Sequence, residues 1–279
     1  MDPAKVKELE EKCKRIRYLI VDTIGTTGSG HVGGSLSAVE AVVTLYYHHM
    51  HIDPARPDLP GRDRFVLSKG HAGPVLYAVL ADKGFFDLSW LHTMNKIGTR
   101  LPSHVDRTKT PGVDMTAGSL GQGLSAAVGM ALGSRLAGDG AHIYCMVGDG
   151  EIQEGQIWEA AMFAKHEKLD RLICFLDYNK QQIDGFVEEM TGVGPIPEKW
   201  RAFGWNVIEC PGHDIAAIDA AIEQAKAHTG SPSMIILDTV KGKGYARAEQ
   251  SPLSCHSMSF TKEEHADALR ELEGGLQDA

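Results

Sequence analysis

Apolar side chains recur at every third or fourth position near the start of the chain, before a stretch rich in glycine. Side chains with this spacing share one face of a helix, so the pattern predicts an amphipathic helix. The helix is expected to end where the glycines between 25 and 30 begin. Its apolar positions are Val6, Leu9, Cys13, Ile16, Ile20 and Ile24.

Short apolar runs rich in β-branched and aromatic residues alternate with helical patterns along the rest of the chain. This alternation predicts an α/β fold with an open, mostly parallel sheet flanked by helices. The predicted strands lie at 64–68, 142–147, 171–177, 205–210 and 233–238. The predicted helices lie at 35–48, 73–83, 121–138, 152–168, 214–228 and 261–272.

Two long segments carry no convincing helix or strand pattern. One runs from Asn95 to Gly118, and the other is an irregular stretch before the strand at 205–210. Loops of this length in a compact domain are usually functional or disordered. Because no repeat or linker is visible, we expect residues 1–279 to form a single domain with a tail from about residue 241.

Composition and charge argue against several functional classes. Acidic residues outnumber basic residues by 37 to 28, so no net positive field attracts nucleic acid phosphates. No apolar run is long enough to span a membrane, and the start of the chain is too charged for a signal peptide, so we expect a cytoplasmic location. The five cysteines form no CxxC pair and mostly lie in apolar runs, as buried reduced thiols do.

Glycine and polar residues follow two consecutive predicted strands in a pattern that suits a bound diphosphate. The backbone at Gly148 and Gly150 can approach a ligand closely, and Asp149 between them offers a carboxylate oxygen. Asn179 follows the next strand, so its side chain is expected at the same edge of the sheet. With the main-chain carbonyl of Gln181, diphosphate oxygens and a water, these groups would complete an octahedral Mg²⁺ or Ca²⁺ site.

The tripeptide GDG is by itself a turn signal, but GDG followed by Asn179 after a second apolar strand is the pattern of thiamine diphosphate enzymes. The segment GDGEIQEGQIWEA resembles the transketolase version of this pattern. Further segments resemble the same family in order along the chain: SGHVGGSLS, SKGHAGPVLYAVL, LPSHVD, TAGSLGQGLSAAVGMAL and TVKGKG. The chain therefore resembles the amino-terminal, diphosphate-binding half of a transketolase, and looks like one subunit of a split enzyme.

The resemblance implies that thiamine diphosphate is bound with Mg²⁺ or Ca²⁺, and that a two-carbon ketol unit is transferred from a ketose phosphate to an aldose. Imidazole suits this chemistry because it donates to sugar hydroxyls and carries protons near neutral pH. The implied catalytic residues are His31, His71, His104 and Glu154. The implied cofactor-binding residues are Gly118, Leu120, Gly148, Asp149, Gly150, Glu151, Asn179 and His256, and the metal ligands are Asp149, Asn179 and Gln181.

Three segments differ from the sequence that is commoner in the family. The chain has GHVGG around His31 in place of GHPGG, and PSHVD around His104 in place of a segment like PGHPE. Both differences remove a proline, so we expect less rigid loops and an altered substrate preference. The loop QSPLSCHSMSF around His256 also departs from the family wording.

In the family the cofactor lies across two polypeptides, and the glutamate that protonates its pyrimidine belongs to the half that this chain lacks. The resemblance therefore implies a separate C-terminal transketolase subunit, with the pyrimidine-binding and C-terminal domains, in an α₂β₂ complex. We expect the isolated chain to be inactive. The small-residue helix at 121–137 and the helix that bears Glu154 and Glu159 are expected near subunit contacts, because paired carboxylates need a neighbour.

Two alternatives remain open on the sequence. The chain could belong to another thiamine diphosphate enzyme, such as a deoxyxylulose-phosphate synthase or a 2-oxoacid dehydrogenase, although QEGQIWEA and LPSHVD favour transketolase. It could also be a non-catalytic regulatory or scaffold homologue. The intact carboxylate, carboxamide and histidines of the predicted site argue against that second alternative.

Three other features are interpreted without a catalytic role. The segment HHMH ends a helix, where positive charge is favourable, and no Cys or Asp cluster adjoins it, so a transition-metal site is not expected. Its histidines are His48, His49 and His51. The segment KGKG at 241–244 lacks the P-loop pattern and is interpreted as a turn that closes over the cofactor. Trp158 and Phe163 are expected on a buried helix face.

Overall fold

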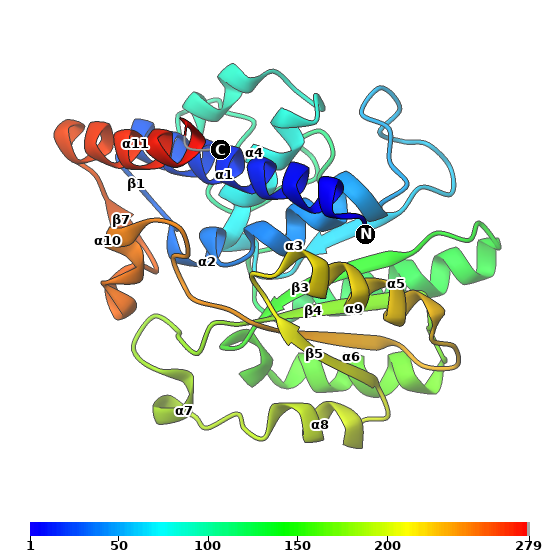
Figure 1. Ribbon diagram of the computed structural model, residues 1–279. Helices are drawn as coiled ribbons and strands as arrows, with labels where there is room; N and C mark the ends of the chain where they lie inside the picture. Colours follow the sequence, from blue (N-terminus) through cyan, green and yellow to red (C-terminus); the bar gives the residue numbers. More distant parts are fainter. Residues whose placement is uncertain (278–279) are drawn as a thin grey trace.

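The centre of the fold is a parallel sheet of five strands, in the order β2-β3-β4-β6-β5 (Figure 1). The computed structural model describes residues 1–277, apart from the side chains of residues 252 and 275–277. The strands are β2 (Arg64–Leu67), β3 (Ile143–Gly148), β4 (Leu172–Tyr178), β5 (Asn206–Pro211) and β6 (Ser233–Asp238). The predicted α/β fold and all five predicted strands are confirmed.

Helices cover both faces of this sheet, because side chains of each strand alternate between two hydrophobic cores. Tyr144 and Met146 point into one core, and Cys145 and Val147 point into the other. The first core is covered by α1 (Pro3–Thr27), α2 (Gly33–Leu36), α3 (Val39–Thr44), α4 (Gly73–Asp82), α9 (Ile215–Ala227) and α11 (Lys262–Gln277). The second is covered by α5 (Gln122–Ala137), α6 (Gly155–His166), α7 (Val187–Met190) and α8 (Ile196–Ala202).

The predicted first helix is confirmed, and it runs three residues further than expected, through Gly25 to Thr27. The Asp2 side chain caps α1 by accepting from the Lys5 N–H at 2.9 Å, and proline occupies the first turn. Gly28 ends the helix in the left-handed region with φ of 91°. The helix then packs beside α11, so the two ends of the described chain lie on the same layer (Figure 1).

Two predicted segments differ from the structure. The helix expected at 35–48 is broken at Ser37, where the hydroxyl donates to Asp177 at 2.7 Å, and it ends in a π-helical turn, η1 (Leu45–His49). The stretch expected to be irregular before β5 contains α7 and α8, whose apolar side chains Val187 and Trp200 are buried in the second core. The segment from Asn95 to Gly118 has no helix or strand, as predicted.

The polypeptide after β6 returns to the glycine-rich loop near the start of the chain. The short strands β1 (Ser29–Gly30) and β7 (Met258–Ser259) pair antiparallel, and the Gly33 N–H donates to the Cys255 carbonyl at 2.7 Å. A Cβ at Gly33 would lie 2.8 Å from that carbonyl, so this approach requires glycine. The short elements between are α10 (Ala246–Glu249) and η5 (Pro252–Ser254).

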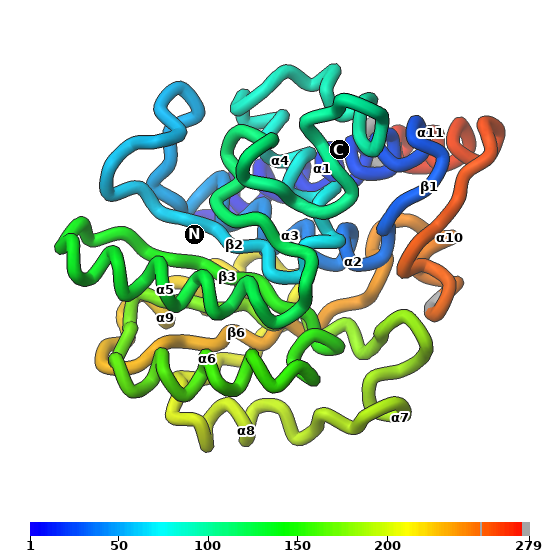
Figure 2. Tube along the Cα trace, turned by 180° about the vertical axis from the view of Figure 1, so that it is seen from behind, coloured from blue at the N-terminus to red at the C-terminus, as the bar shows by residue number. Residues whose placement is uncertain are grey.

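Three short 3₁₀ helices complete the described elements: η2 (Gly70–Ala72), η3 (Leu88–Thr93) and η4 (Glu151–Gln153). The last of these forms the first turn of the helix predicted at 152–168, and α6 follows it. Within residues 1–277, no helix is both long and apolar enough to cross a membrane. On the far side of the sheet, α5 and α6 lie side by side (Figure 2).

Candidate active site

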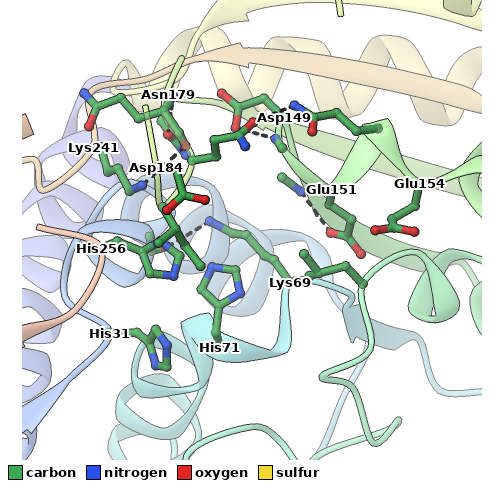
Figure 3. Close-up of a pocket in the computed structure, with 18 of the residues that line it drawn as sticks. His31, Lys69, His71, Asp149, Glu151, Glu154, Asn179, Asp184, Lys241 and His256 are labelled. Atoms are coloured by element: carbon green, nitrogen blue, oxygen red, sulfur yellow. Dashed lines mark hydrogen bonds between the residues drawn. The ribbon is translucent and has the colours of Figure 1, made fainter. Parts of the chain in front are cut away.

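A cavity of about 400 Å³ opens beyond the carboxyl ends of β3 and β4, which is where parallel sheets usually bind their ligands. All of the site residues predicted from the sequence line this one cavity. Figure 3 shows His31, His71 and His256 together on one side and Asp149 and Asn179 on the other. The structure therefore brings the predicted residues together, while the role of each stays a prediction.

Asp149 follows β3 and is 2% exposed. Its two carboxylate oxygens accept from the backbone N–H groups of Gly150 at 2.8 Å and of Lys180 at 2.5 Å. Lys180 adopts a left-handed conformation with φ of 66°, which turns the loop after β4 toward this carboxylate. Burial and the nearby Asp177 carboxylate raise the pKa of Asp149 to about 7, so the two N–H donors and the Lys241 ammonium only partly compensate its ionised form.

Asn179 and Gln181 follow β4 and supply two neutral oxygens beside Asp149. The Asn179 amide donates to Asp177 at 3.1 Å, and its Oδ1 accepts from the Gln181 N–H at 3.1 Å. The Gln181 side-chain Oε1 is buried without a hydrogen-bond partner. A buried, only partly compensated carboxylate beside carboxamide and carbonyl oxygens is the donor set that a hard divalent cation prefers, so these residues fit Mg²⁺ or Ca²⁺.

A buried carboxylate that the sequence analysis missed holds the loops of the site together. Asp177 accepts from the Lys69 ammonium at 2.5 Å and from the Ser37 hydroxyl at 2.7 Å, and also from Thr239 at 2.5 Å. Burial opposes its charge, but the Lys69 ammonium and these donors lower the pKa of Asp177 to about 2. One side chain of β4 thus fixes segments that follow three other elements of the fold.

Four imidazoles form a cluster on the other side of the cavity. The ring centroid of His31 lies 5.4 Å from that of His71, 5.5 Å from that of His104 and 5.3 Å from that of His256. Each histidine comes from a different segment of the chain. The loop that carries His104 approaches η2 closely, because a Cβ at Gly70 would lie 2.3 Å from a backbone oxygen of that loop.

The environment keeps these imidazoles neutral. Burial, the Lys69 ammonium and the neighbouring rings lower the pKa of His71 to about 2. Burial and the Lys241 ammonium lower the pKa of His256 to about 4, and burial also lowers the pKa values of His31 and His104. A neutral imidazole can donate one hydrogen bond and accept a proton at the other nitrogen.

The two predicted glutamates differ in their environments. Glu151 is buried and accepts from the Ser68 hydroxyl and from the N–H groups of Gly121 at 2.9 Å and Gly148 at 3.0 Å, so it orders the loop after β3. Burial raises its pKa. Glu154 is exposed at the rim of the cavity. Both line the cavity, but only Glu154 has a carboxylate that is open to the surface.

Two lysines complete the lining and were not predicted as site residues. Lys69 and Lys241 are 2% and 3% exposed, and the Lys241 ammonium donates to the Gln181 carbonyl at 3.3 Å. Each directly precedes a glycine, in SKGHAGP and in KGKG. That position, beside backbone that can approach a ligand closely, was the signal in the sequence that could have identified them. Buried ammonium groups beside glycine backbone suit an anionic ligand.

One predicted packing role is wrong in part. Trp158 packs against Trp200 and Phe203, with ring centroids 5.0 Å and 4.9 Å away, as expected of a core residue. Phe163 is instead 46% exposed, because the turn of α6 carries it away from the sheet.

The sequence is similar to known proteins along nearly its whole length. The family described as "Transketolase, thiamine diphosphate binding domain" matches residues 9–275. The 6-deoxy-6-sulfo-D-fructose transketolase subunit SqwG of Clostridium sp. (strain MSTE9) is 53% identical, over 95% of this chain and 96% of its own. One of the apulose-4-phosphate transketolase subunits of Actinobacillus succinogenes is 39% identical, over 90% of this chain and 91% of its own.

Solved structures show the same relation in three dimensions. The transketolase of Leishmania mexicana superimposes with a TM-score of 0.88 at 31% identity, over 96% of this chain. The match covers 41% of that longer chain. The similarity to full-length transketolases is thus confined to a part of their length, whereas the similarity to the two named subunits spans them almost completely.

Proposed function

Because this chain belongs to the transketolase family, through its thiamine diphosphate-binding domain, we propose that its cavity holds the diphosphate half of thiamine diphosphate in a split transketolase. The reaction is the transfer of a two-carbon ketol unit from a ketose to an aldose. The observation that carries the proposal is that one cavity has a buried, only partly compensated Asp149 on one side and four neutral imidazoles on the other. The family itself was predicted correctly from the sequence.

The acidic side of the cavity has the role of binding the diphosphate through a metal. Asp149, Asn179 and the Gln181 carbonyl would hold Mg²⁺ or Ca²⁺, while Lys69 and Lys241 add positive charge. The cofactor, when bound, supplies the carbanion chemistry on the two-carbon unit. The protein contributes the position of the diphosphate and a cavity from which much of the solvent is excluded.

The histidine side has the role of binding the sugars and moving protons. His31, His71 and His104 lie within reach of one another, so neighbouring hydroxyls of one sugar can contact different rings. As neutral rings they donate hydrogen bonds to hydroxyl or carbonyl oxygens and accept a proton from a hydroxyl at the free nitrogen. Burial lowers the pKa of all three rings, and the Lys69 ammonium and the neighbouring imidazoles lower that of His71 further, so a ring that takes a proton releases it again readily.

We propose that a separate C-terminal subunit completes the site in an α₂β₂ complex. Support comes from the two relatives of similar length, which are themselves named as transketolase subunits. Further support comes from the exposed apolar side chains on α5 and α6, Leu136 at 77%, Met162 at 56% and Phe163 at 46% exposure. Glycines 129 and 133 leave open space on α5, where a partner helix can approach.

For the donor we propose 6-deoxy-6-sulfo-D-fructose, because the relative named for this sugar is 53% identical. The relative named for apulose 4-phosphate is 39% identical. We therefore propose a sulfosugar donor in preference to the ketose phosphate that the resemblance implies. We also propose a cytoplasmic location and a single domain for residues 1–279.

The test is reconstitution of the chain with a C-terminal transketolase subunit from the same source. We expect ketol transfer from 6-deoxy-6-sulfo-D-fructose in the presence of Mg²⁺ and thiamine diphosphate, and none from the isolated chain. Fructose 6-phosphate and apulose 4-phosphate test the other sugars, and pyruvate tests the 2-oxoacid and deoxyxylulose-phosphate alternatives. Steady turnover by the isolated chain, or product from pyruvate alone, would overturn the proposal. Cofactor-independent assembly without any turnover would favour the scaffold alternative.

A further inference from the structure

A second group of histidines lies at the opposite edge of the sheet from the cavity. His48 and His49 are the last residues of η1. This turn continues from α3 and leads away from Ser37, which contacts Asp177 beside the cavity. Two residues later, the His51 N–H donates at 2.8 Å to Asp63, which directly precedes β2 and also accepts from the His142 N–H before β3. The histidines therefore lie near the amino ends of the strands, whereas the cavity lies beyond their carboxyl ends.

The fold brings a carboxylate from a distant part of the sequence to these histidines. Asp219 of α9 points at them, with its Oδ1 2.9 Å from His49 Nε2 and 3.4 Å from His48 Nε2. One ligand atom from each of the three residues lies within 4.8 Å of the others. The expectation that no Asp adjoins the HHMH segment holds for the sequence but not for the folded chain.

The buried atoms of this group are not satisfied by hydrogen bonds. The side chains of His49 and Asp219 are 2% and 7% exposed, and His49 Nε2 and Asp219 Oδ1 each lack a hydrogen-bond partner. They approach each other to 2.9 Å without the alignment that a hydrogen bond needs. Buried polar atoms that lack a hydrogen-bond partner usually interact with another group, such as a bound ion.

The other polar side-chain atoms of Asp219 and His49 already have partners. The Met1 ammonium donates to Asp219 Oδ2 at 2.8 Å, which leaves Oδ1 facing the histidines. Glu223 Oε1 lies 3.2 Å from His49 Nδ1, and a carboxylate at that nitrogen orients a ring whose other nitrogen binds a metal. Lys226 Nζ lies 3.0 Å from the same nitrogen and 3.5 Å from Glu223, so it pairs with Glu223 when Nδ1 carries the proton.

We propose that His48 Nε2, His49 Nε2 and Asp219 Oδ1 bind a transition-metal dication of the zinc class, with a water as the fourth ligand. With bonds of about 2.1 Å, the Asp219 Oδ1 separations of 2.9 Å from His49 Nε2 and 3.4 Å from His48 Nε2 correspond to angles of about 90° and 110° at the metal, and both of these angles suit a four-coordinate site. Two imidazoles and one carboxylate select zinc, cobalt or iron over magnesium or calcium. The bound ion joins the end of η1 to α9 and stabilises the folded chain.

The test uses the metal-free full-length chain and Zn²⁺ alone as the probe. We expect wild type to take up one Zn²⁺, and His48→Ala to bind it at least tenfold more weakly, because one of three protein ligands is lost. His51→Ala is the matched control, since His51 is an exposed histidine of the same segment that contributes no ligand atom to the group, and it should bind as wild type does. His48 is 35% exposed, so its truncation should leave the fold intact.

Two further readouts separate this site from the metal ligands in the cavity. Co²⁺ in the wild-type chain should give the intense visible absorption of a four-coordinate site, and His48→Ala should lose it while Asp149→Asn keeps it. Zn²⁺ should raise the Tm of wild type and of His51→Ala but not that of His48→Ala. Equal Zn²⁺ affinity in wild type and His48→Ala, or no uptake by wild type, would overturn the proposal.

Discussion

The cavity and the helix-end group, formed by His48, His49 and Asp219, use the same kinds of side chain but pair them differently. In the cavity, His71 is surrounded by imidazoles and the Lys69 ammonium, and the carboxylates of Asp149 and Asp177 are tied to other partners. At the helix ends, His49 faces the Asp219 carboxylate directly. In both regions burial and a nearby ammonium keep the imidazole neutral, whereas at the helix ends a carboxylate oxygen also faces the ring nitrogen, and that pair of atoms can hold a cation.

The two regions also differ in what surrounds them. Glycine backbone and loop segments border the cavity, so a large ligand can enter. The hydrogen bonds that Asp177 accepts hold these loops in place. The helix-end group lies where α9 packs against α3, at the end of the turn that continues α3, and its His49 and Asp219 side chains are buried. The neighbouring charges and the surrounding structure therefore decide which ligand a histidine cluster can bind.

The largest expected effect breaks the acidic side of the cavity. Asp149→Ala and Asn179→Ala should each weaken metal-dependent binding of thiamine diphosphate by more than about 100-fold, because a lost ligand exceeds the typical loss from an outer-shell partner. Calorimetric titration with Mg²⁺ and thiamine diphosphate measures this, with the reconstituted complex as the sample. His48→Ala is the control, and normal cofactor binding by either cavity variant would remove the proposed ligands.

Replacing the cavity histidines should change turnover without loss of cofactor. His31→Ala, His71→Ala and His104→Ala should each lower kcat/KM about 10²- to 10⁴-fold if the ring transfers a proton, and less if it only binds a hydroxyl. Steady-state kinetics of the reconstituted complex, measured together with the cofactor affinity, distinguish an effect on turnover from an effect on cofactor binding. Unchanged kinetics in all three variants would assign these rings no part in the reaction.

Removing one partner of the buried Asp177 carboxylate should destabilise the folded chain. Lys69→Met leaves the buried Asp177 without its ammonium, and removal of one partner of a buried pair typically costs about 3–5 kcal/mol of unfolding free energy. Lys69→Met combined with Asp177→Leu should recover part of that loss, because no unpaired charge remains. Urea unfolding measures both, and a double variant less stable than Lys69→Met would contradict this account.

The sequence predicted the sheet, its order of elements and the gathering of the site residues, because those depend on periodic patterns and on glycine motifs at strand ends. It did not predict α7 and α8, whose short helical turns carry too few apolar positions to show a period. It also missed Asp177 and Asp219, since each meets its partners only through the folded chain: Lys69 is 108 positions away in the sequence from Asp177. Motifs identify residues that bind ligands, but not the buried side chains that position them.

The smallest expected effect concerns pH. The pKa of His71 is lowered to about 2 and those of His49 and His256 to about 4, whereas an unfolded histidine titrates near 6.5. Between pH 6.5 and 4 the unfolded chain therefore binds protons that the folded chain does not, so these groups make the unfolding free energy fall as pH falls. Each contributes at most about 1.4 kcal/mol per pH unit.

Asp149 acts in the opposite direction over the same range. Its pKa is raised to about 7, so the folded chain keeps a proton that the unfolded carboxyl releases above about 4, and this titration lowers stability as pH rises. His256→Asn should therefore flatten the acid decline of the metal-free chain, and Asp149→Asn should steepen it. Urea unfolding at pH 4.5, 5.5 and 6.5 measures the two slopes, with His51→Asn as the control for loss of an exposed imidazole. Identical slopes in both cavity variants and wild type would show that neither group titrates as the structure indicates.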